Sequence, residues 1–173
     1  MGYYIAKTAE IGKVRFDNGK IVVSDPGYDL DTIWNRKLEV KKGEYTAHIT
    51  YGDFKDWGER VSEIYINHST TPKKKATTRI GRCAVDSGQC GFFEFEDFKK
   101  FHPEHENNVN AEAWYWRACE ITDKKENHRS GLMESLGKIV GVLSESGFGD
   151  GCYWLYAGYN NRGEITALRL RFI

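Results

Sequence analysis

The length, composition and charge of the chain indicate one soluble domain and argue against a general nucleic-acid binder. The chain has 173 residues, of which 40% are apolar and 29% charged, and its formal net charge is zero. Ten Tyr, five Trp and 18 Gly against three Pro favour short strands and tight turns over a helical bundle. A nucleic-acid binder normally carries a basic excess, because neutralising phosphates supplies most of its affinity. We therefore expect a single domain over residues 1–173 without a nucleic-acid partner.

The sequence shows no export or membrane signal. Residues 1–16 lack a charged segment followed by an apolar run, and no stretch approaches the roughly 18 apolar residues of a membrane span. The four cysteines, Cys83, Cys90, Cys119 and Cys152, form no Cys-x-x-Cys pair. We expect a cytoplasmic protein with reduced, mostly buried thiols, and a disulfide or a cysteine-bound metal is the alternative.

Two hairpins are predicted in the first third of the chain. Residues 13–26 contain two apolar runs joined by Asn18-Gly19, the favoured pair for a two-residue hairpin turn because both positions accept positive φ. Residues 38–52 contain two further runs that are predicted to turn near Gly43.

The middle of the chain predicts strands, a loop and a short helix. Residues 60–69 follow an imperfect period of two and predict a strand, whereas the polar, basic segment 70–79 predicts an exposed loop. Residues 80–95 predict a strand broken by a glycine-rich bend. Phenylalanines at a spacing of three within residues 95–104 predict a short helix that ends at Pro103.

The last third of the chain is predicted to be mostly strand. Residues 113–122 alternate and are dense in aromatics, so we predict a strand, with a helix as the alternative. Residues 123–131 predict a loop and residues 138–144 a strand. Residues 152–173 predict two strands joined by a turn at residues 160–163.

These elements together predict a mainly-β fold. The architecture that fits best is an antiparallel β-sandwich or rolled sheet with one or two short helices. No long amphipathic helix separates the strands, which argues against a doubly wound α/β fold. In the last strand, Thr166, Leu168, Leu170 and Phe172 alternate with more polar residues and are predicted to face the core.

Three segments repeat one pattern, in which a strand delivers a carboxylate and a hydroxyl into a glycine-containing bend and an aromatic residue follows. They are the first bend (residues 24–28), the second bend (86–89) and the third bend (144–151). The candidate ligand-binding residues in and beside these bends are Ser24, Asp25, Tyr28, Asp86, Ser87, Gln89, Ser146, Phe148, Asp150 and Trp154.

The three bends have a structural and a functional interpretation. Asp and Ser bond their own backbone in turns and Gly supplies positive φ, so each bend can simply end a strand. Alternatively, the bends meet at one end of the sheet and form a polar pocket walled by aromatics, since rigid strands commonly present binding residues on loops. The choice depends on strand order, which these patterns do not determine.

The order of these blocks resembles an uncharacterised bacterial domain family of unknown function. The resemblance rests on "VVSDPGY", "WGERV", "VDSGQCGFF" and "SESGFGDGCY", and it covers residues 10–173. This chain departs from the pattern at Glu145, where the family has Ser, and at Cys90, where it has Ala. The resemblance implies a compact single domain and no established activity. The positions that match its pattern are Asp25, Asp86, Gln89 and Asp150.

Two functions follow from a shared pocket. In the first, Gly, Ser and Gln donors with aromatic walls bind a small polar ligand or a protein partner, in an immunity-type or sequestering role. In the alternative, Asp25, Asp86 and Asp150 hold Mg²⁺ or Ca²⁺ for a metal-dependent hydrolase, because hard cations prefer oxygen ligands.

Three other motifs have simpler interpretations. "HPEHE" at residues 102–106 is interpreted as a solvated loop rather than a metal site, because a proline interrupts it. Trp114 and Trp116 share a face at strand spacing and are predicted to be buried aromatics. Arg60 is a candidate partner for a loop carboxylate, which would give the aspartates a structural role.

Overall fold

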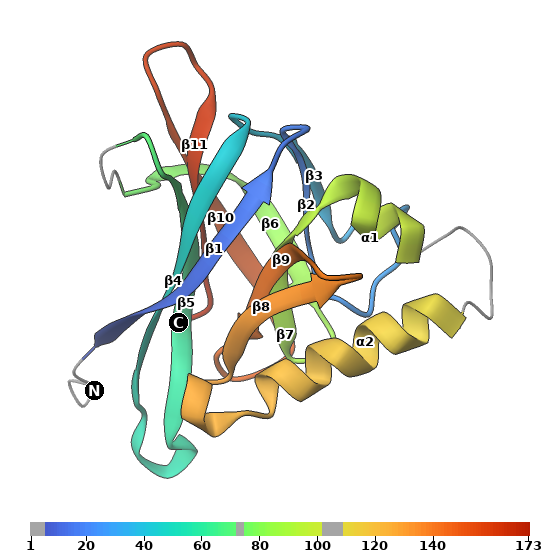
Figure 1. Ribbon diagram of the computed structural model, residues 1–173. Helices are drawn as coiled ribbons and strands as arrows, with labels where there is room; N and C mark the ends of the chain where they lie inside the picture. The colour runs from blue at the N-terminus through green and yellow to red at the C-terminus, as the bar shows by residue number, and fades with distance from the viewer. Residues whose placement is uncertain (1–5, 72–74, 102–108) are drawn as a thin grey trace.

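The computed structural model describes residues 6–71, 75–101 and 109–173, and it consists of two antiparallel sheets and two α-helices (Figure 1). The first sheet, here sheet A, contains in spatial order β1 (Lys7–Phe16), β4 (Gly43–Asp53), β5 (Glu59–His68), β11 (Ile165–Arg171), β10 (Gly151–Tyr159) and β6 (Thr78–Val85). The second, sheet B, contains β3 (Arg36–Glu39), β2 (Lys20–Ser24), β7 (Gln89–Glu94), β9 (Lys138–Glu145) and β8 (Ser130–Ser135). The prediction of a mainly-β antiparallel sandwich is confirmed.

The two sheets enclose the main core. Phe16 and Tyr45 from sheet A pack with Phe92 from sheet B, and all three are fully buried. Leu168 and Leu170 of β11 lie in the same cluster, as the alternation of that strand predicted. Because every second residue of a strand points to the same face, one apolar face from each sheet is enough to build this layer.

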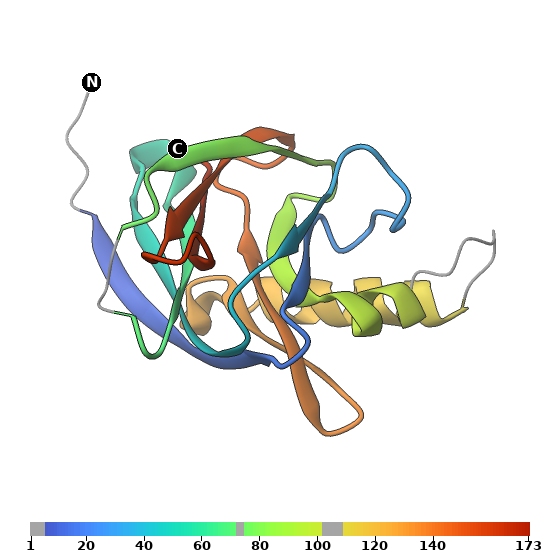
Figure 2. The same cartoon turned by 90° about the horizontal axis from the view of Figure 1, so that it is seen from above.

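The helices cover the other face of sheet B (Figure 2). They are α1 (Phe95–Phe101) and α2 (Val109–Thr122), and 3-10 turns lie at η1 (Lys55–Trp57) and η2 (Lys125–Asn127). Phe98 and Trp114 from the helices pack on Phe93 and Met133 of the sheet in a second core. None of the helices in the described ranges is long and apolar enough to cross a membrane.

Residues 113–122 are helical, so the strand predicted there is wrong. Trp114 and Ala118, four residues apart, are buried against sheet B, whereas Trp116 is 58% exposed. The two tryptophans therefore do not share a face. The aromatic alternation was the misleading signal, and the spacing of four between the buried residues is the helical one.

Both predicted early hairpins are also wrong, although the turn at Asn18-Gly19 forms. Gly19 has φ 66° and its amide donates to the Phe16 carbonyl at 3.1 Å, yet β1 lies in sheet A and β2 in sheet B. Likewise, β3 belongs to sheet B and β4 to sheet A. A local turn signal fixes a chain reversal, but the pairing partner depends on which sheet buries each apolar face. The predicted pairing of β10 with β11 is confirmed.

Most other predicted elements are confirmed. Strands β5, β6, β7 and β9 and helix α1 form where they were predicted, and Pro103 lies outside the described residues. Strand β8 was not predicted, and its first two residues fall in the loop predicted for residues 123–131, because it is a short edge strand without clear alternation. The predicted exposed loop at 70–79 is wrong at its end. Ala76 is buried on the outside of sheet A, and Thr78 begins β6.

Candidate functional site

The three bends meet at one end of the sandwich. The Asp25 carboxylate of the first bend accepts hydrogen bonds from the second bend, whose Gly88 carbonyl accepts one from the Ser146 amide of the third at 2.9 Å. Strand order explains the convergence, because β7 pairs antiparallel with both β2 and β9. The end of β2, the start of β7 and the end of β9 therefore lie together.

Asp25 links the first two bends. Its Oδ1 accepts from the Gly27 amide at 2.7 Å and the Ser87 hydroxyl at 2.7 Å. Its Oδ2 accepts from the Asp86 amide at 2.8 Å and the Ser87 amide at 2.7 Å. The residue is fully buried, so these four donors replace the water that its charge would otherwise require. Asp25 therefore holds the shape of the site.

The third bend is held by its backbone and by a tyrosine rather than by Asp150. The Ser146 hydroxyl donates to the Gly149 carbonyl at 2.8 Å, and the Tyr153 hydroxyl donates to the same carbonyl at 2.5 Å. Gly147 and Gly149 adopt φ of 62° and 110°, a region that favours glycine. The Asp150 side chain is exposed and makes no hydrogen bond with a described residue.

An acidic recess of about 400 Å³ lies where the first two bends face helix α2. We define the acidic recess by its lining residues, Asp25, Gly27, Tyr28, Asp29, Asp86, Ser87, Glu112 and Tyr115. Four of these eight side chains are carboxylic acids, two are tyrosines, and none of the described lining residues is Lys or Arg. The recess is therefore a region of negative potential with two flat walls.

The surroundings of the acidic recess raise the pKa of both of its tyrosines. Burial first, and then the charges of Asp25 and Asp86, raise the pKa of Tyr28. The exposed carboxylate of Asp150 acts on Tyr28 in the same direction. A hydrogen bond with Cys119 and burial raise the pKa of Tyr115. Both rings therefore keep their hydroxyl protons at neutral pH and offer neutral aromatic faces.

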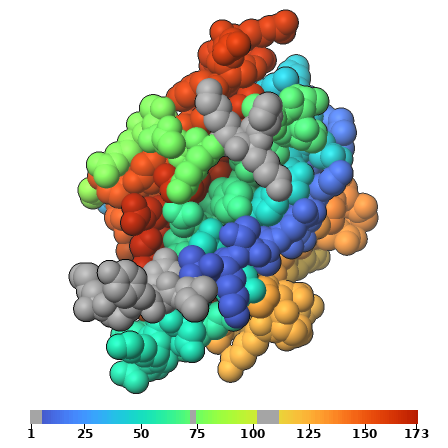
Figure 3. Space-filling view, turned by 90° about the vertical axis from the view of Figure 1, so that its left-hand side faces the viewer, coloured from blue at the N-terminus to red at the C-terminus, as the bar shows by residue number. Residues whose placement is uncertain are grey.

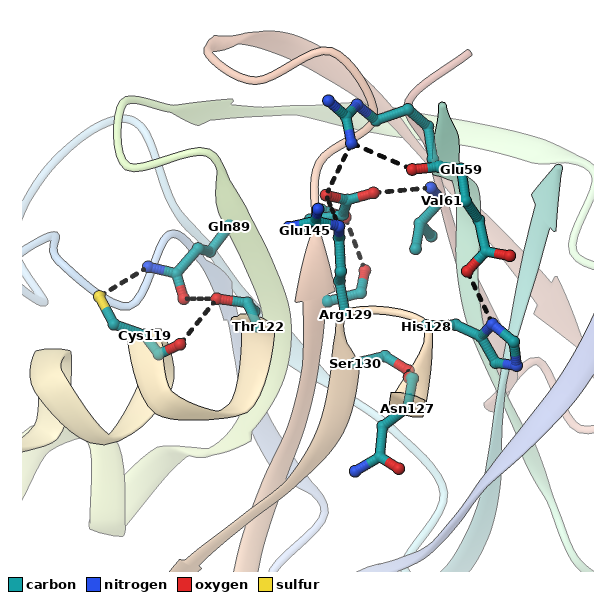
Figure 4. Close-up of polar contacts among 12 residues, drawn as sticks. Glu59, Val61, Gln89, Cys119, Thr122, Asn127, His128, Arg129, Ser130 and Glu145 are labelled. Atoms are coloured by element: carbon teal, nitrogen blue, oxygen red, sulfur yellow. Dashed lines mark hydrogen bonds and ion pairs between the residues drawn. The ribbon is translucent and has the colours of Figure 1, made fainter. Parts of the chain in front are cut away.

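A smaller hollow of about 230 Å³ adjoins the recess and shares Ser87 and Tyr115 with it. Gln89 lines this hollow, and Figure 4 shows its side chain pointing toward Cys119 and Thr122 of α2. The Gln89 amide donates to the Cys119 sulfur at 3.3 Å, and its oxygen accepts from the Thr122 hydroxyl at 3.0 Å. Gln89 thus fastens the second bend to α2 and sets the distance between the walls of the recess.

Glu145 also lines this smaller hollow. Its carboxylate accepts from the Val61 amide at 3.1 Å and lies 3.4 Å from Arg129 and 3.9 Å from Arg60 (Figure 4). Burial raises its pKa, against the lowering effect of these partners. The carboxylate that pairs with Arg60 is therefore that of Glu145, the last residue of β9, and not one of the three aspartates.

Six of the ten sequence-predicted site residues do not line the acidic recess: Ser24, Gln89, Ser146, Phe148, Asp150 and Trp154. Ser24 is buried and donates to the Asp25 carbonyl at 2.8 Å. Phe148 packs on Trp57, with ring centroids 5.3 Å apart. Trp154 lies on the face of sheet A that points away from the core, beneath arginines of β6. The aromatic walls come instead from Tyr28 and Tyr115.

The sequence analysis missed three lining residues, Asp29, Glu112 and Tyr115. Glu112 and Tyr115 lie three residues apart on α2, a spacing that brings side chains to one face of a helix. The signal was present, but the strand prediction for residues 113–122 concealed it. Asp29 follows the first bend directly and carried no motif of its own.

The geometry does not favour the metal-dependent alternative. Within the described residues, no group of three or more His, Cys, Asp or Glu side chains is placed to hold a metal ion. Both oxygens of Asp25 already accept two hydrogen bonds each, and Asp150 does not line the recess with Asp25 and Asp86. "HPEHE" lies outside the described residues.

The four cysteines are free thiols. Cys83 and Cys90 are buried with their sulfurs 3.6 Å apart, whereas Cys119 is half-buried and Cys152 is exposed. Burial, together with the neighbouring Cys83, raises the pKa of Cys90 well above its ordinary value. Two of the four thiols are therefore buried, and reduced thiols remain a prediction.

Comparison with known proteins identifies the family. The model of the family described as "Protein of unknown function (DUF4241)" matches residues 14–170, so the chain belongs to this family. The resemblance to an uncharacterised family of unknown function is thereby confirmed. No curated protein matches the chain, and no solved structure does.

Proposed function

We propose that this member of the DUF4241 family is a binding module that holds a small, positively charged polar ligand in the acidic recess. The observation that carries the proposal is the lining of the recess: four carboxylic acids and two tyrosines, with no cationic side chain among the described lining residues. Its volume of about 400 Å³ falls within the range typical of small-molecule pockets, roughly 300–1,000 Å³.

The chemistry of the walls suits an ammonium or guanidinium group. Asp86, Asp29 and Glu112 are exposed at the rim, so their charges remain available to a ligand. Asp25 at the base is saturated by four protein donors and contributes charge rather than a free acceptor. The neutral rings of Tyr28 and Tyr115 can stack on a cation, an interaction worth about 0.5–2 kcal/mol.

The recess is also built to keep its shape. The Asp25 hydrogen bonds fix the first bend to the second, and Gln89 fixes the second bend to α2. Because these contacts exist before a ligand arrives, little conformational entropy is lost on binding. A recess that is formed before binding suits a sequestering or immunity-type role, which we propose for a single cytoplasmic domain. A protein partner that inserts a Lys or Arg side chain is the other occupant that the recess could take.

The test is a titration with agmatine, which carries both an ammonium and a guanidinium group, followed by amide chemical shifts and calorimetry. We expect saturable binding, with shifts confined to the three bends and α2. Asp86→Asn and Glu112→Gln should each weaken binding about tenfold, which corresponds to about 1.4 kcal/mol. The matched control is Glu96→Gln, an exposed acid on α1 outside the recess.

Two outcomes would change the proposal. If an arginine-containing peptide binds with shifts in the recess and agmatine does not, the occupant is a protein partner. If neither probe binds, or if Glu96→Gln weakens binding as much as Asp86→Asn does, the recess is not a cation site.

A further inference from the structure

The part of the outer face of sheet A formed by β6, β10 and β11 carries more positive than negative charge, in contrast to the acidic recess. Figure 3 looks onto this face. Strands β6, β10 and β11 contain four arginines, Arg79, Arg82, Arg169 and Arg171, and no Asp or Glu. Arg169 is neutralised by Glu63 of β5, with 2.7 Å between the guanidinium and the carboxylate. The other three arginines remain as an excess of charge in a chain whose net charge is zero.

Two of these guanidinium groups converge on one ring. The guanidinium carbon of Arg82 lies 4.0 Å from the ring centroid of Trp154, and that of Arg79 lies 4.7 Å from the same centroid. Arg171 is the register partner of Trp154 on the opposite neighbouring strand. Trp154 is thus bordered by arginines on both sides, and in the described part of the chain Arg79 and Arg82 contact aromatic groups rather than carboxylates.

A β-bulge creates this arrangement. Arg79 and Arg82 are three residues apart, so in a regular strand they would point to opposite faces. The register of β6 against β10 shifts between Leu155 and Tyr156, which leaves one extra residue in β6. Arg82 then pairs with Trp154 and Arg79 with Tyr156, on one face. Bulges at sheet edges commonly re-aim a side chain in this way, and β6 is an edge strand.

The arrangement leaves hydrogen-bonding capacity unused. The guanidinium carbons of Arg82 and Arg79 lie 4.0 Å and 4.7 Å from the ring centroid of Trp154, and a guanidinium carries five N–H donors in a planar fork that matches an oxyanion in a bidentate geometry. Two like charges beside one ring repel each other, a cost that a bound anion would offset. Arg79 also lowers the pKa of the Tyr156 hydroxyl through a hydrogen bond, in keeping with the positive field of this face.

We propose that Arg79, Arg82 and Arg171, arranged around Trp154, form a binding site for a phosphate-type oxyanion, either free phosphate or the phosphate group of a small ester. We call this the arginine site. It is independent of the acidic recess, because the two share no lining residue.

The experiment is a titration of the protein at low ionic strength with inorganic phosphate and with phenyl phosphate, followed by the arginine Nε–H resonances. We expect saturable shifts at Arg79 and Arg82 with at least one probe. Tighter binding of phenyl phosphate would identify an ester ligand, and equal affinities would identify the free anion. Arg82→Gln should weaken binding at least fivefold, and the double variant Arg79→Gln/Arg82→Gln should abolish it.

The control is Arg162→Gln, which removes an exposed arginine from the β10–β11 turn and should leave affinity unchanged. Arg82→Lys keeps the charge but loses the planar stack, so its affinity should fall as well. Urea midpoints establish that each variant is folded. The proposal is overturned if neither probe saturates, if Arg162→Gln weakens binding as much as Arg82→Gln, or if only a single-stranded oligonucleotide binds.

Discussion

The acidic recess and the arginine site carry opposite charges, and the two sites differ in the groups that surround those charges. In the recess, a buried carboxylate is saturated by four backbone and hydroxyl donors, and three exposed carboxylates lie at the rim. In the arginine site, guanidinium groups lie on an aromatic ring without acidic neighbours in their own strands. A net charge of zero therefore says little about the local field, because charges of one sign are concentrated at each of these two places.

The two regions also differ in the interactions that maintain their shape. The recess depends on hydrogen bonds between three bends that are distant in sequence, so its shape is coupled to the stability of the fold. The arginine site depends on strand register and one bulge, and its key side chains are on the surface. Substitutions should therefore affect folding in the recess and mainly binding at the arginine site.

The largest expected effect separates structural from exposed aspartates. Asp25→Asn should destabilise the protein by about 3 kcal/mol, because each carboxylate oxygen accepts two hydrogen bonds and, in either orientation of the new amide, its NH2 end faces two donors that it cannot accept. Asp150→Asn, the same chemical change on an exposed side chain, should change the free energy of unfolding by less than about 0.5 kcal/mol. Urea unfolding followed by circular dichroism measures both. Equal effects would contradict the roles assigned to the two residues.

Charge reversal should separate the two sites. Arg82→Glu should abolish phosphate binding and leave agmatine binding within about twofold, and Asp86→Lys should do the opposite. Loss of one ligand is expected to exceed tenfold, about 1.4 kcal/mol, whereas long-range effects on the other are screened by salt within roughly 10 Å. Calorimetry with both ligands on both variants gives the four affinities. If either variant weakens both ligands equally, the regions are not independent.

A smaller effect is expected from the bulge itself. Gly81 has φ 155°, and an added Cβ would lie 2.8 Å from the Arg36 Nε atom, so Gly81→Val should destabilise the fold by about 1–2 kcal/mol. It should also weaken phosphate binding severalfold by disturbing Arg79 and Arg82. Gly163→Ala is the control, because it has φ 78° but open space around it. Gly163→Ala should lower the temperature of thermal unfolding and leave the affinity for phosphate unchanged.

The smallest expected effect is a pH dependence from Glu145. Burial raises its pKa in the folded protein above the ordinary value of 4.5, so the folded state keeps its proton when the unfolded chain has lost it. This contribution to stability is complete below pH 4.5 and is lost as pH rises through the folded pKa. In Glu145→Gln this fall should vanish, and in Glu96→Gln it should remain. Urea unfolding from pH 4 to 7 measures the pH dependence of the free energy of unfolding. If Glu145→Gln showed the same pH dependence as the wild-type protein, the assignment to Glu145 would be contradicted.

Local sequence patterns located the candidate site in part. The repeated bend pattern pointed to Asp25, Asp86, Ser87 and Tyr28, and all four line the acidic recess. The same pattern also pointed to Phe148 and Trp154, which lie elsewhere, because an aromatic residue after a bend can point to any of several surfaces. Glu112 and Tyr115 were missed because their contribution depends on a helix that packs across the end of sheet B.

The sequence alone determined the secondary structure of most strands, the alternation of β11 and the mainly-β class, because period-two burial is a local property of the chain. Only the tertiary structure decided which sheet each strand joins, that the three bends meet, and that Arg79 and Arg82 share a face. These features depend on pairing between segments far apart in sequence and on a bulge between β6 and β10. Such contacts are fixed by the burial of whole faces, and no short stretch of residues specifies them.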